Sequence, residues 1–572
     1  MKSNWMVYSK KADFKAVGDK YGIDQVIARV IRNRDVISDG DINQYLNGTM
    51  ENLYSPTLLK DAEKSIDIIV EKINENKKIC VIGDYDADGI CSTAILVKGL
   101  KEAGADVMYM VPHRIDDGYG INVHMIDRAL EAGVDTIITC DNGIAAISQI
   151  AYAKDKGMTV IVTDHHEMPY EEHGGIKEFQ YTDADAVINP HQPECSYPFQ
   201  LLCGAGVAYK LMILLFKKLE LDLIKLEELA QLASVATVGD LVQLKNENRI
   251  LVRYGLKHMA HTKNIGLKAL IEVCELDIYH MTSYHFGFVI CPCLNASGRL
   301  ETASMAIELL LSEKESEAIK MAKELRAVNE ERKQMTQEEK DRAVLQVESS
   351  DILKDNVLVV YLPECHESIA GLVAGDLKER YYKPTIVITK SKEGAKGSAR
   401  SIESYNMFEE LSKCKDLFTA FGGHPMAAGL SLPEENIDIL RKRLNENQTL
   451  TEKELTPCRW IDVPMPVDYV SFDLVEQLHV LEPFGMGNEK PVFADRNLKV
   501  RTVSVIGKNK NVLKLQLESG YGKIIEAIQF RVDVDNIPEH GQSISIIYYP
   551  DINEYNGRRS LQFVIQEWKA VQ

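Results

Sequence analysis

Residues 81–89 read Val-Ile-Gly-Asp84-Tyr-Asp86-Ala-Asp88-Gly89 and continue an apolar run that begins at residue 78. Three carboxylates within five residues repel one another, and a divalent cation removes that repulsion. Carboxylate oxygens suit hard cations such as Mg²⁺ and Mn²⁺. A calcium loop does not fit, because no glutamate follows at the required spacing and the run leaves a predicted strand instead of a helix. A solvated acidic turn is the alternative to a metal site.

The chain between residues 60 and 190 alternates short apolar runs with amphipathic segments that end at glycine. Glycine just after an amphipathic run is the usual end of a helix. The alternation therefore predicts βαβ units and a parallel sheet in an α/β fold. The predicted strands cover residues 78–82, 107–111, 136–140 and 159–163.

Three of the predicted strands are followed directly by aspartate or histidine, which are residue types that commonly bind metals. The first precedes the aspartate run, the third precedes Asp141, and the fourth precedes Asp164, His165 and His166. Ligands of open parallel sheets bind at the carboxyl ends of the strands, so we expect a metal centre at this edge. Such a set can hold two ions about 3.5–4 Å apart, with Asp141 as a bridging carboxylate. Histidine among the carboxylates favours Mn²⁺ over Mg²⁺.

Length and composition limit the interpretation further. A chain of 572 residues predicts three or four domains. Eleven cysteines without a paired framework predict a reducing, cytoplasmic environment, and no apolar run is long enough to cross a membrane. The net charge of −19 opposes general nucleic-acid binding, so any such contact is expected within a channel whose basic groups or metal ions supply positive charge.

The second half of the chain predicts three further parts. Residues 301–350 are charged and amphipathic, without proline or glycine, and predict one long helix between two domains. A second α/β unit is predicted over about 355–450. Five short alternating segments after residue 498 predict a small barrel, for which an oligonucleotide-binding OB-fold is the best match.

Asp164-His165-His166 is the signature of the DHH phosphoesterase superfamily, which this chain resembles. The form of the aspartate run resembles the RecJ family of single-strand-specific 5′→3′ exonucleases. Further motifs of that family follow in the same order, and the resemblance covers residues 50–570 approximately. They are Thr-Val-Gly-Asp at 237–240, Asn-Ala-Ser-Gly-Arg at 295–299, Gly-Gly-His-Pro-Met-Ala-Ala-Gly of a DHHA1 domain at 422–429, and Leu-Glu-Pro-Phe-Gly-Met-Gly-Asn at 481–488.

The resemblance implies five parts of the chain. They are an N-terminal helical segment (1–50), a DHH catalytic domain (51–300), a connecting helix (301–350), a DHHA1 domain (351–447) and an OB-fold nucleic-acid-binding domain (456–572). The sequence departs from the family at two places. Pro292-Cys293 replaces the usual Pro-Arg, which removes a basic group, and Gly239-Asp240-Leu-Val-Gln243 replaces Ala-Asp-Val-Val-Pro.

The resemblance also implies the roles of individual residues. The expected metal ligands are Asp84, Asp86, Asp88, Asp141, His165 and Asp240. His166 is expected near the scissile phosphate and, with Asp141, to be catalytic. The expected substrate contacts are Arg114, Arg299, Ser398, Arg400 and His424, of which Ser398 and Arg400 lie in the Gly-Ser-Ala-Arg-Ser element at 397–401.

The implied activity is hydrolysis of single-stranded DNA from a phosphorylated 5′ end, with two Mn²⁺ or Mg²⁺ ions, to 5′-mononucleotides in DNA repair and recombination. A helicase and a single-strand-binding protein are the expected partners. Two alternatives stay open. One is a DHH–DHHA1 phosphodiesterase acting on short oligonucleotides or cyclic dinucleotides, which the predicted OB module opposes. The other is a DHH-derived scaffold without activity, which the retained metal ligands oppose.

Overall fold

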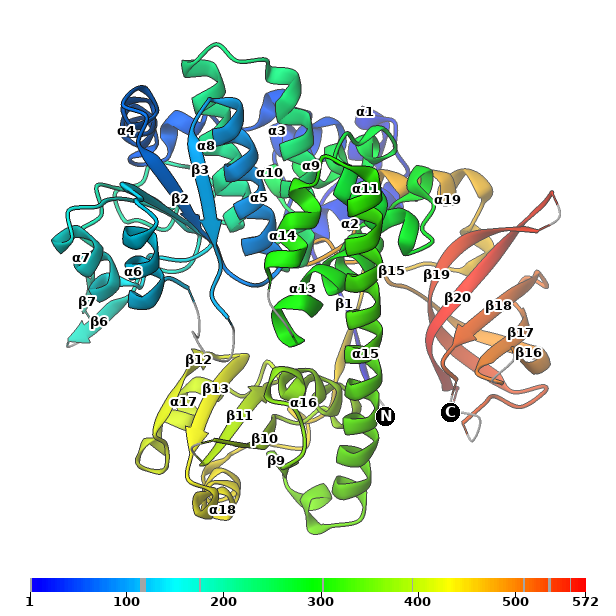
Figure 1. Ribbon diagram of the computed structural model, residues 1–572. Helices are drawn as coiled ribbons and strands as arrows, with labels where there is room; N and C mark the ends of the chain where they lie inside the picture. The colour runs from blue at the N-terminus through cyan, green and yellow to red at the C-terminus, as the bar shows by residue number, and fades with distance from the viewer. Residues whose placement is uncertain are drawn as a thin grey trace. The chain divides into compact units, whose positions relative to one another are not determined.

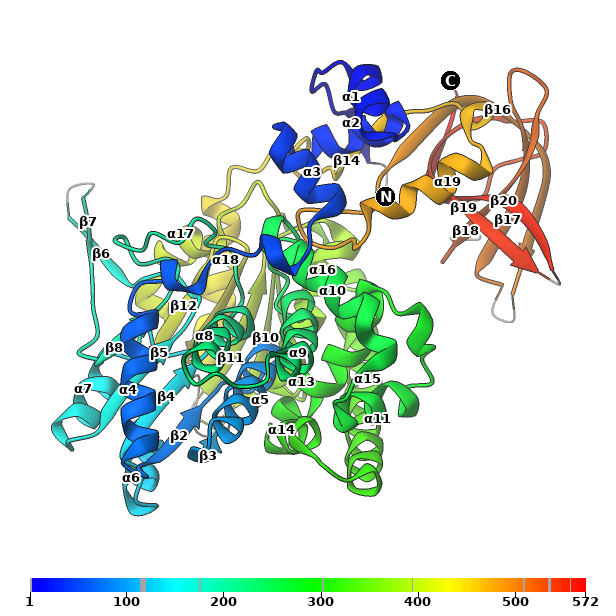
Figure 2. The same cartoon turned by 90° about the horizontal axis from the view of Figure 1, so that it is seen from above.

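The computed structural model describes residues 3–113, 120–173, 176–300, 303–392, 394–507, 510–532, 536–555 and 557–571. The chain divides into two compact units. The first is built from residues 54–240 and 255–457, and the second from residues 4–53, 241–254 and 458–572. Figures 1 and 2 show the two units, each of which is described by itself below.

The first unit begins with a five-stranded parallel sheet, which confirms the predicted α/β fold. Its strand order is β3 (Asp106–Met110), β2 (Lys78–Ile82), β4 (Thr136–Cys140), β5 (Thr159–Thr163) and β8 (Ala186–Ile188). The central strands are buried along almost their whole length, as the apolar sequence of a doubly covered parallel sheet requires. Strands β3 and β4 flank β2 on its two sides, so the chain crosses over β2 after β3. The ends of β2 and β4 therefore lie side by side.

Helices cover both faces of this sheet (Figure 1). On one face, α6 (Val123–Glu131) and α7 (Ile147–Asp155) share a core with Cys80 and Ile82. On the other face lie α5 (Ala87–Glu102) and α8 (Gly204–Lys218), which contact each other and α9 (Leu226–Gly239). The remaining elements of this part are α4 (Ala62–Asn74), the hairpin β6 (Tyr170–His173) and β7 (Ile176–Phe179), α11 (Ile265–Val273), α12 (Ser283–His285), a π-helix (Phe286–Ile290) and α13 (Cys291–Leu300).

The stretch 301–350, expected as one helix, contains two helices within its described part, residues 303–350. The apolar α14 (Ser304–Leu311) packs against α5, and three residues separate it from the 34-residue α15 (Glu315–Glu348). The prediction missed the break, which lies where the Ser312 hydroxyl accepts a hydrogen bond from Lys314 N (3.4 Å) and donates one to Lys314 O (3.2 Å). Such a local side-chain bond competes with helical backbone bonding. From α11 and α13, α15 continues to the second sheet, as Figure 1 shows.

The second sheet is mixed, with the order β12 (Ala420–His424), β13 (Ala427–Leu432), β11 (Gly394–Arg400), β10 (Thr385–Ser391) and β9 (Leu358–Tyr361). Only β9 and β10 are parallel. Helix α16 (Glu367–Tyr381) lies against β10 and β11 and also contacts α15. Two further helices, α17 (Met407–Ser412) and α18 (Ile437–Asn447), complete this part.

The second unit contains the predicted five-stranded C-terminal module. Backbone pairing runs in a closed circle through β16, β17, β18, β20 and β19 and back to β16, with only β18 and β20 parallel. The strands are β16 (Phe493–Ile506), β17 (Val512–Glu518), β18 (Ile524–Phe530), β19 (Ser543–Tyr555) and β20 (Arg558–Ala570). This order is that of an OB-fold barrel.

The N-terminal helices belong to the same unit as the barrel (Figure 2). Side chains of α2 and α3 share one hydrophobic core with the barrel strands. Arg34, just after α2, holds Asp462 through Nη1–Oδ1 and Nη2–Oδ2 contacts of 2.8 and 3.2 Å. The other elements are β1 (Asn4–Val7), α1 (Phe14–Tyr21), α2 (Gln25–Asn33), α3 (Asp39–Asn47), the start of α10 (Asn246–His258), β14 (Cys458–Ile461), β15 (Val463–Pro464) and α19 (Phe472–Leu478).

Within the part of the chain that the structure describes, no helix is long and apolar enough to cross a membrane.

Candidate metal centre and phosphate site

The aspartate run forms the turn between β2 and α5. Asp86 is the N-cap of α5, and its Oδ1 accepts hydrogen bonds from Asp88 N (3.0 Å) and Gly89 N (3.2 Å). The partial positive charge of a helix N-terminus favours carboxylates at this position. Asp84 and Asp88 are both about 1% exposed. Burying these carboxylates is unfavourable unless a cation accompanies them.

Asp88 also joins α5 to α8. Its two carboxylate oxygens accept hydrogen bonds from Gly204 N (2.6 Å) and Ala205 N (2.8 Å), the first residues of α8. A Cβ on Gly204 would lie 2.8 Å from Asp141 Cβ, so only glycine lets α8 approach this closely. Each oxygen of Asp88 keeps a lone pair, which allows metal binding in addition to this anchoring role.

Asp141 directly follows β4 and has a left-handed backbone conformation, with φ of 60°. Such a conformation is uncommon for a residue with a side chain and occurs often at functional sites. The next residue, Asn142, holds the turn, since its Nδ2 donates to Ile82 O (3.1 Å) and Cys140 O (2.9 Å). The ends of β2 and β4 are therefore locked together, with their aspartates on one edge.

His165 Nε2 lies at the centre of these carboxylates. It is 3.1 Å from Asp141 Oδ1, 3.6 Å from Asp88 Oδ2 and 3.6 Å from Asp240 Oδ2. Although the first distance is short, this buried nitrogen makes no hydrogen bond of acceptable geometry among the described residues. A nitrogen surrounded by carboxylate oxygens without a hydrogen bond has the arrangement of ligands around a cation, so the residues fit a metal centre.

The ligand atoms group into three overlapping sets, each within 4.8 Å. The sets are Asp84, Asp86 and Asp141; Asp88, His165 and Asp240; and Asp141, His165 and His166. Asp141 and His165 each belong to two sets, which suits ligands between neighbouring ions. Burial first, and the neighbouring carboxylates second, raise the pKa of Asp141 well above its usual range and that of Asp240 to about 9.

His166 is held by Asp164. The Nδ1 atom lies 2.7 Å from Asp164 Oδ1, which also accepts the backbone N–H of His165 (2.7 Å), while Asp164 Oδ2 accepts Ile144 N (2.9 Å). Burial opposes the imidazolium, but the bond to Asp164 and the nearby carboxylates outweigh it and raise the pKa of His166 to about 9. The side chain is 43% exposed, so solvent screens part of this effect.

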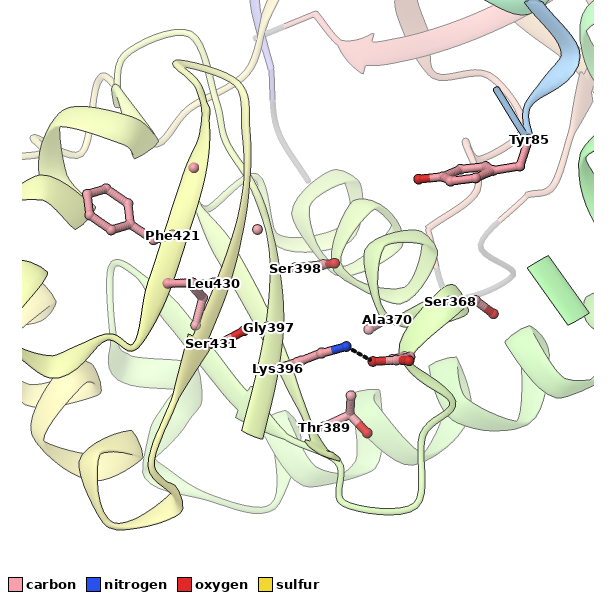
Figure 3. A pocket seen from close by; sticks show the side chains of 14 residues that line it. Tyr85, Ser368, Ala370, Thr389, Lys396, Gly397, Ser398, Phe421, Leu430 and Ser431 are labelled. Carbon is pink, nitrogen blue, oxygen red and sulfur yellow. Dashed lines mark ion pairs between the residues drawn. The ribbon is translucent and has the colours of Figure 1, made fainter. Parts of the chain in front are cut away.

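Ser398 and Arg400 lie on β11 and face α16. A Cβ on Gly371 of α16 would lie 2.9 Å from Arg400 Nη2 and 3.5 Å from Ser398 Cβ, so the two side chains lie together over this glycine. Ser398 lines a pocket of about 440 Å³ whose other walls include Phe421 and Tyr85 (Figure 3). Tyr85 belongs to the aspartate run, so the metal loop and the candidate phosphate residue border the same space.

The structure thus brings together the six expected metal ligands, with His166 beside them. Arg299 is placed differently from the other expected substrate contacts, because its Nη1 donates to the backbone oxygen of Ser368 on α16 (2.7 Å). His424 ends β12, is exposed and is not among the pocket-lining residues. Arg114 lies outside the described residues.

Four residues of the site received no individual role from the sequence, although Asp164 was noted there at a strand end. Asp164, Asn142, Asn295 and Tyr85 all lie in motifs that the sequence made visible, but their roles are hydrogen bonding and packing between loops. Asn295 Oδ1 accepts a hydrogen bond from Ala87 N (2.6 Å) and so ties α13 to the metal loop. The only available signal was their position beside a predicted ligand or within a glycine-rich motif.

Comparison with known proteins agrees with this architecture. Family models match residues 78–237 (DHH family, N-terminal domain), 354–449 (DHHA1 domain) and 461–567 (RecJ OB domain). The single-stranded-DNA-specific exonuclease RecJ of Bacillus subtilis is 35% identical over 99% of this chain and 71% of its own length. The strand order, the cluster of candidate metal ligands and the family models together define a DHH–DHHA1 protein with a C-terminal OB domain. The chain belongs to the RecJ family.

Two solved structures extend the comparison. RecJ from Thermus thermophilus in complex with Mn²⁺ has a TM-score of 0.84 and 24% identity, covering 100% of this chain and 80% of that chain, and shows the shared fold. An exonuclease RecJ bound to manganese has a TM-score of 0.60 and 29% identity, covering 70% of this chain and 98% of that chain.

Proposed function

We propose that this protein is a metal-dependent exonuclease that hydrolyses single-stranded DNA from its 5′ end and releases 5′-mononucleotides. The observation that carries the proposal is the buried His165 nitrogen, which lies within 3.6 Å of carboxylates from three separate segments. The named activity of the Bacillus subtilis relative and the manganese of the 29% identical structure support it.

Mn²⁺ or Mg²⁺, as two ions, would be held by Asp84, Asp86, Asp88, Asp141, His165 and Asp240. When bound, the ions supply a nucleophilic water at neutral pH and neutralise charge on the phosphoryl oxygens. The chain's own contribution is to hold the ligands in place. Asp86 is fixed by the cap of α5, Asp88 by α8, and Asp141 by the turn that Asn142 locks.

His166 acts on the phosphate through its Nε2. Because Asp164 engages Nδ1, the protonated ring presents its second N–H away from Asp164. A positively charged donor beside the metal cluster stabilises the negative charge that develops on the scissile phosphate. In this arrangement Asp164 is a positioning residue that orients and charges His166.

The 5′-phosphate would bind to Ser398 and Arg400, with Arg114, Arg299 and His424 as further contacts to the strand. A hydroxyl and a guanidinium both donate to phosphate oxygens. A terminal phosphate fits this pair only at the end of a strand, which supports exonuclease action. The OB barrel would hold the strand beyond the site.

We also propose the domain limits that the sequence predicts. They are the N-terminal helical segment (1–50), the DHH domain (51–300), the connecting helix (301–350), the DHHA1 domain (351–447) and the OB-fold domain (456–572). We place the protein in the cytoplasm and expect a helicase and a single-strand-binding protein as partners, since both supply or expose single strands. These assignments rest on the proposed substrate.

The deciding assay uses a 5′-phosphorylated single-stranded oligonucleotide with Mn²⁺, compared with duplex DNA, RNA and cyclic di-AMP. Mononucleotide release from single-stranded DNA is expected, whereas release only from cyclic di-AMP would favour the small-substrate phosphodiesterase. Asp141→Ala should abolish cleavage while the protein stays folded. Asp106→Ala, an exposed aspartate on β3, is the matched control and should cleave normally.

A further inference from the structure

Two cysteine thiols from different helical segments face each other beside α15. Cys274 follows α11 directly, Cys293 is the third residue of α13, and their sulfur atoms are 3.9 Å apart. Neither forms a disulfide in this structure, and Cys293 is only about 1% exposed, whereas Cys274 is partly exposed. Both α11 and α13 pack against α15 (Figure 1). Cys293 stands where the RecJ family usually has arginine, so the pair is not part of the family motif.

The surroundings make Cys274 the more reactive of the two thiols. The hydrogen bond from the Cys293 S–H is the largest cause that lowers the pKa of Cys274. The positive charges of Arg326 and Lys333 on α15 lower this pKa further, while burial opposes them. The same hydrogen bond, followed by burial, raises the pKa of Cys293 well above its usual range. Because the thiolate is the form that attacks an oxidant, a small oxidant reacts first at Cys274.

We propose that Cys274 and Cys293 form a reversible disulfide in response to hydrogen peroxide, and that this bond slows the nuclease by loosening the metal loop. The Cys274 thiolate attacks one oxygen of the peroxide, the O–O bond breaks, and a sulfenic acid and hydroxide form. The Cys293 thiol then attacks the sulfenic sulfur, so that the S–S bond forms and the sulfenic oxygen leaves as water. The hydroxide takes up the proton that Cys274 released, so two thiols and one peroxide give one disulfide and two water molecules. A dithiol reverses the step by exchange, which makes the bond transient in a reducing compartment.

Formation of this bond requires the two segments to approach each other. A disulfide has a sulfur–sulfur distance of about 2.0 Å, so the two sulfur atoms must come closer by about 2 Å. The backbone around Cys274 is restrained, because Arg326 Nη1 donates to Val273 O and to Glu275 Oε1 on either side of it. Helix α13 therefore takes up part of the movement and is drawn toward the end of α11.

Helix α13 also supports the metal loop. Asn295 Oδ1 accepts a hydrogen bond from Ala87 N (2.6 Å). A Cβ on Gly298 would lie 2.3 Å from Tyr85 O, so the helix and the loop are already in closest contact. Cys293 and Asn295 are two residues apart, which is about 200° around a helix, and they therefore face opposite sides. A pull on Cys293 toward α11 draws Asn295 away from the loop and lengthens the bond that holds it.

The first test detects the disulfide itself and does not depend on the proposed function. Wild type, Cys274→Ser, Cys293→Ser and Cys195→Ser are treated with hydrogen peroxide, alkylated, digested without reduction and analysed by mass spectrometry. Cys195 is the matched control, because it is also a partly exposed cysteine of the first unit. Wild type and Cys195→Ser should yield two peptides linked through Cys274 and Cys293, which dithiothreitol separates. Absence of this linked pair from wild type, or linkage of Cys274 to another cysteine, would overturn the proposal.

The second test measures the effect on the metal loop, and its cleavage arm rests on the proposed function. Oxidised and desalted wild type should bind Mn²⁺ about tenfold more weakly in a calorimetric titration, the lower end of the losses found when an outer contact of a metal site is removed. It should also cleave single-stranded DNA more slowly. Dithiothreitol, removed before the measurement, should restore both values, and Cys274→Ser should keep them after peroxide. Complete linkage without a change in Mn²⁺ affinity would contradict the effect on the loop.

The variant Asn295→Ala tests the route through α13. It removes the contact to Ala87 but leaves both thiols, so the linked peptides should still form. Its reduced form should have the Mn²⁺ affinity of oxidised wild type, and oxidation should add little to the loss. A further tenfold loss on oxidation would contradict this route. If reduced wild type does not cleave single-stranded DNA, the proposed function fails, while the linked peptides and the Mn²⁺ affinities still decide the redox proposal.

Discussion

The Nδ1 atom of His166 lies 2.7 Å from Oδ1 of Asp164, a carboxylate that is only about 1% exposed. The same carboxylate accepts the backbone N–H groups of His165, His166 and Ile144. Its hydrogen-bonding capacity is therefore used by the protein. Although Asp164 is the first residue of the Asp-His-His motif, it hydrogen-bonds to the two histidines and is not a member of the three groups of candidate metal ligands.

Asp164→Asn should lower kcat for single-stranded DNA by about 10- to 100-fold, the range found when a carboxylate that holds a histidine at a metal site is removed. The amide cannot stabilise the imidazolium and can present N–H where an acceptor is needed. Steady-state cleavage with saturating Mn²⁺ measures the effect, and His166→Gln should give a comparable loss. The double variant should lose little more than either single one, and additive losses would contradict a shared role.

The metal-free protein should lose stability as the pH rises. A carboxyl whose pKa is higher in the folded state than in the unfolded chain stabilises the fold at low pH and loses that contribution as the pH rises through the folded value. For Asp240 the two values are 3.8 and about 9, so the loss extends across this whole interval. Melting curves in EDTA at several pH values measure it.

Mn²⁺ should reverse this trend and stabilise the protein more strongly at pH 8 than at pH 5, because protons compete with the ion for the same carboxylates. Asp240→Asn should flatten the dependence in EDTA. A melting temperature in EDTA that rises between these two pH values would show that other groups control the pH response.

Asp88→Ala should differ from Asp240→Ala. Both changes remove a candidate ligand and should weaken Mn²⁺ binding in a calorimetric titration. Only Asp88 also accepts the first two N–H groups of α8, so its removal should additionally cost about 1–2 kcal/mol of stability in the absence of metal. Asp240→Ala should leave the metal-free protein as stable as wild type or more stable. Equal destabilisation by the two changes would contradict the anchoring role of Asp88.

Arg34→Ala should destabilise the second unit by about 3–5 kcal/mol, because it leaves the carboxylate of Asp462 buried without its charge partner. The two side chains are 7% and 3% exposed. Denaturant unfolding monitored by tryptophan fluorescence can follow this unit, which contains Trp5, Trp460 and Trp568. Replacing both residues, as Arg34→Met with Asp462→Leu, should recover part of the loss.

Local pattern was sufficient for much of the fold. Three of the four predicted strands of the first sheet have the predicted limits, because each is a short apolar run bounded by polar residues. The remaining one, β3, is shifted by one residue. The expected helix over 301–350 was partly wrong, since an amphipathic pattern does not reveal that Ser312 interrupts it. The five barrel strands were expected as short segments after residue 498, but β16 begins at Phe493, and β16, β19 and β20 are 13 or 14 residues long.

The sequence by itself predicted the candidate metal ligands that follow β2, β4 and β5, because parallel strands bring the residues after their carboxyl ends to one edge of a sheet. The family resemblance added Asp240 as a further candidate ligand, and only the tertiary structure decided the contacts between distant segments. It placed Asp240 beside His165, put Tyr85 and Ser398 on one pocket, and packed the N-terminal helices into the core of the C-terminal barrel. These relationships join residues far apart in the chain, and they depend on how helices and sheets pack instead of on any local pattern.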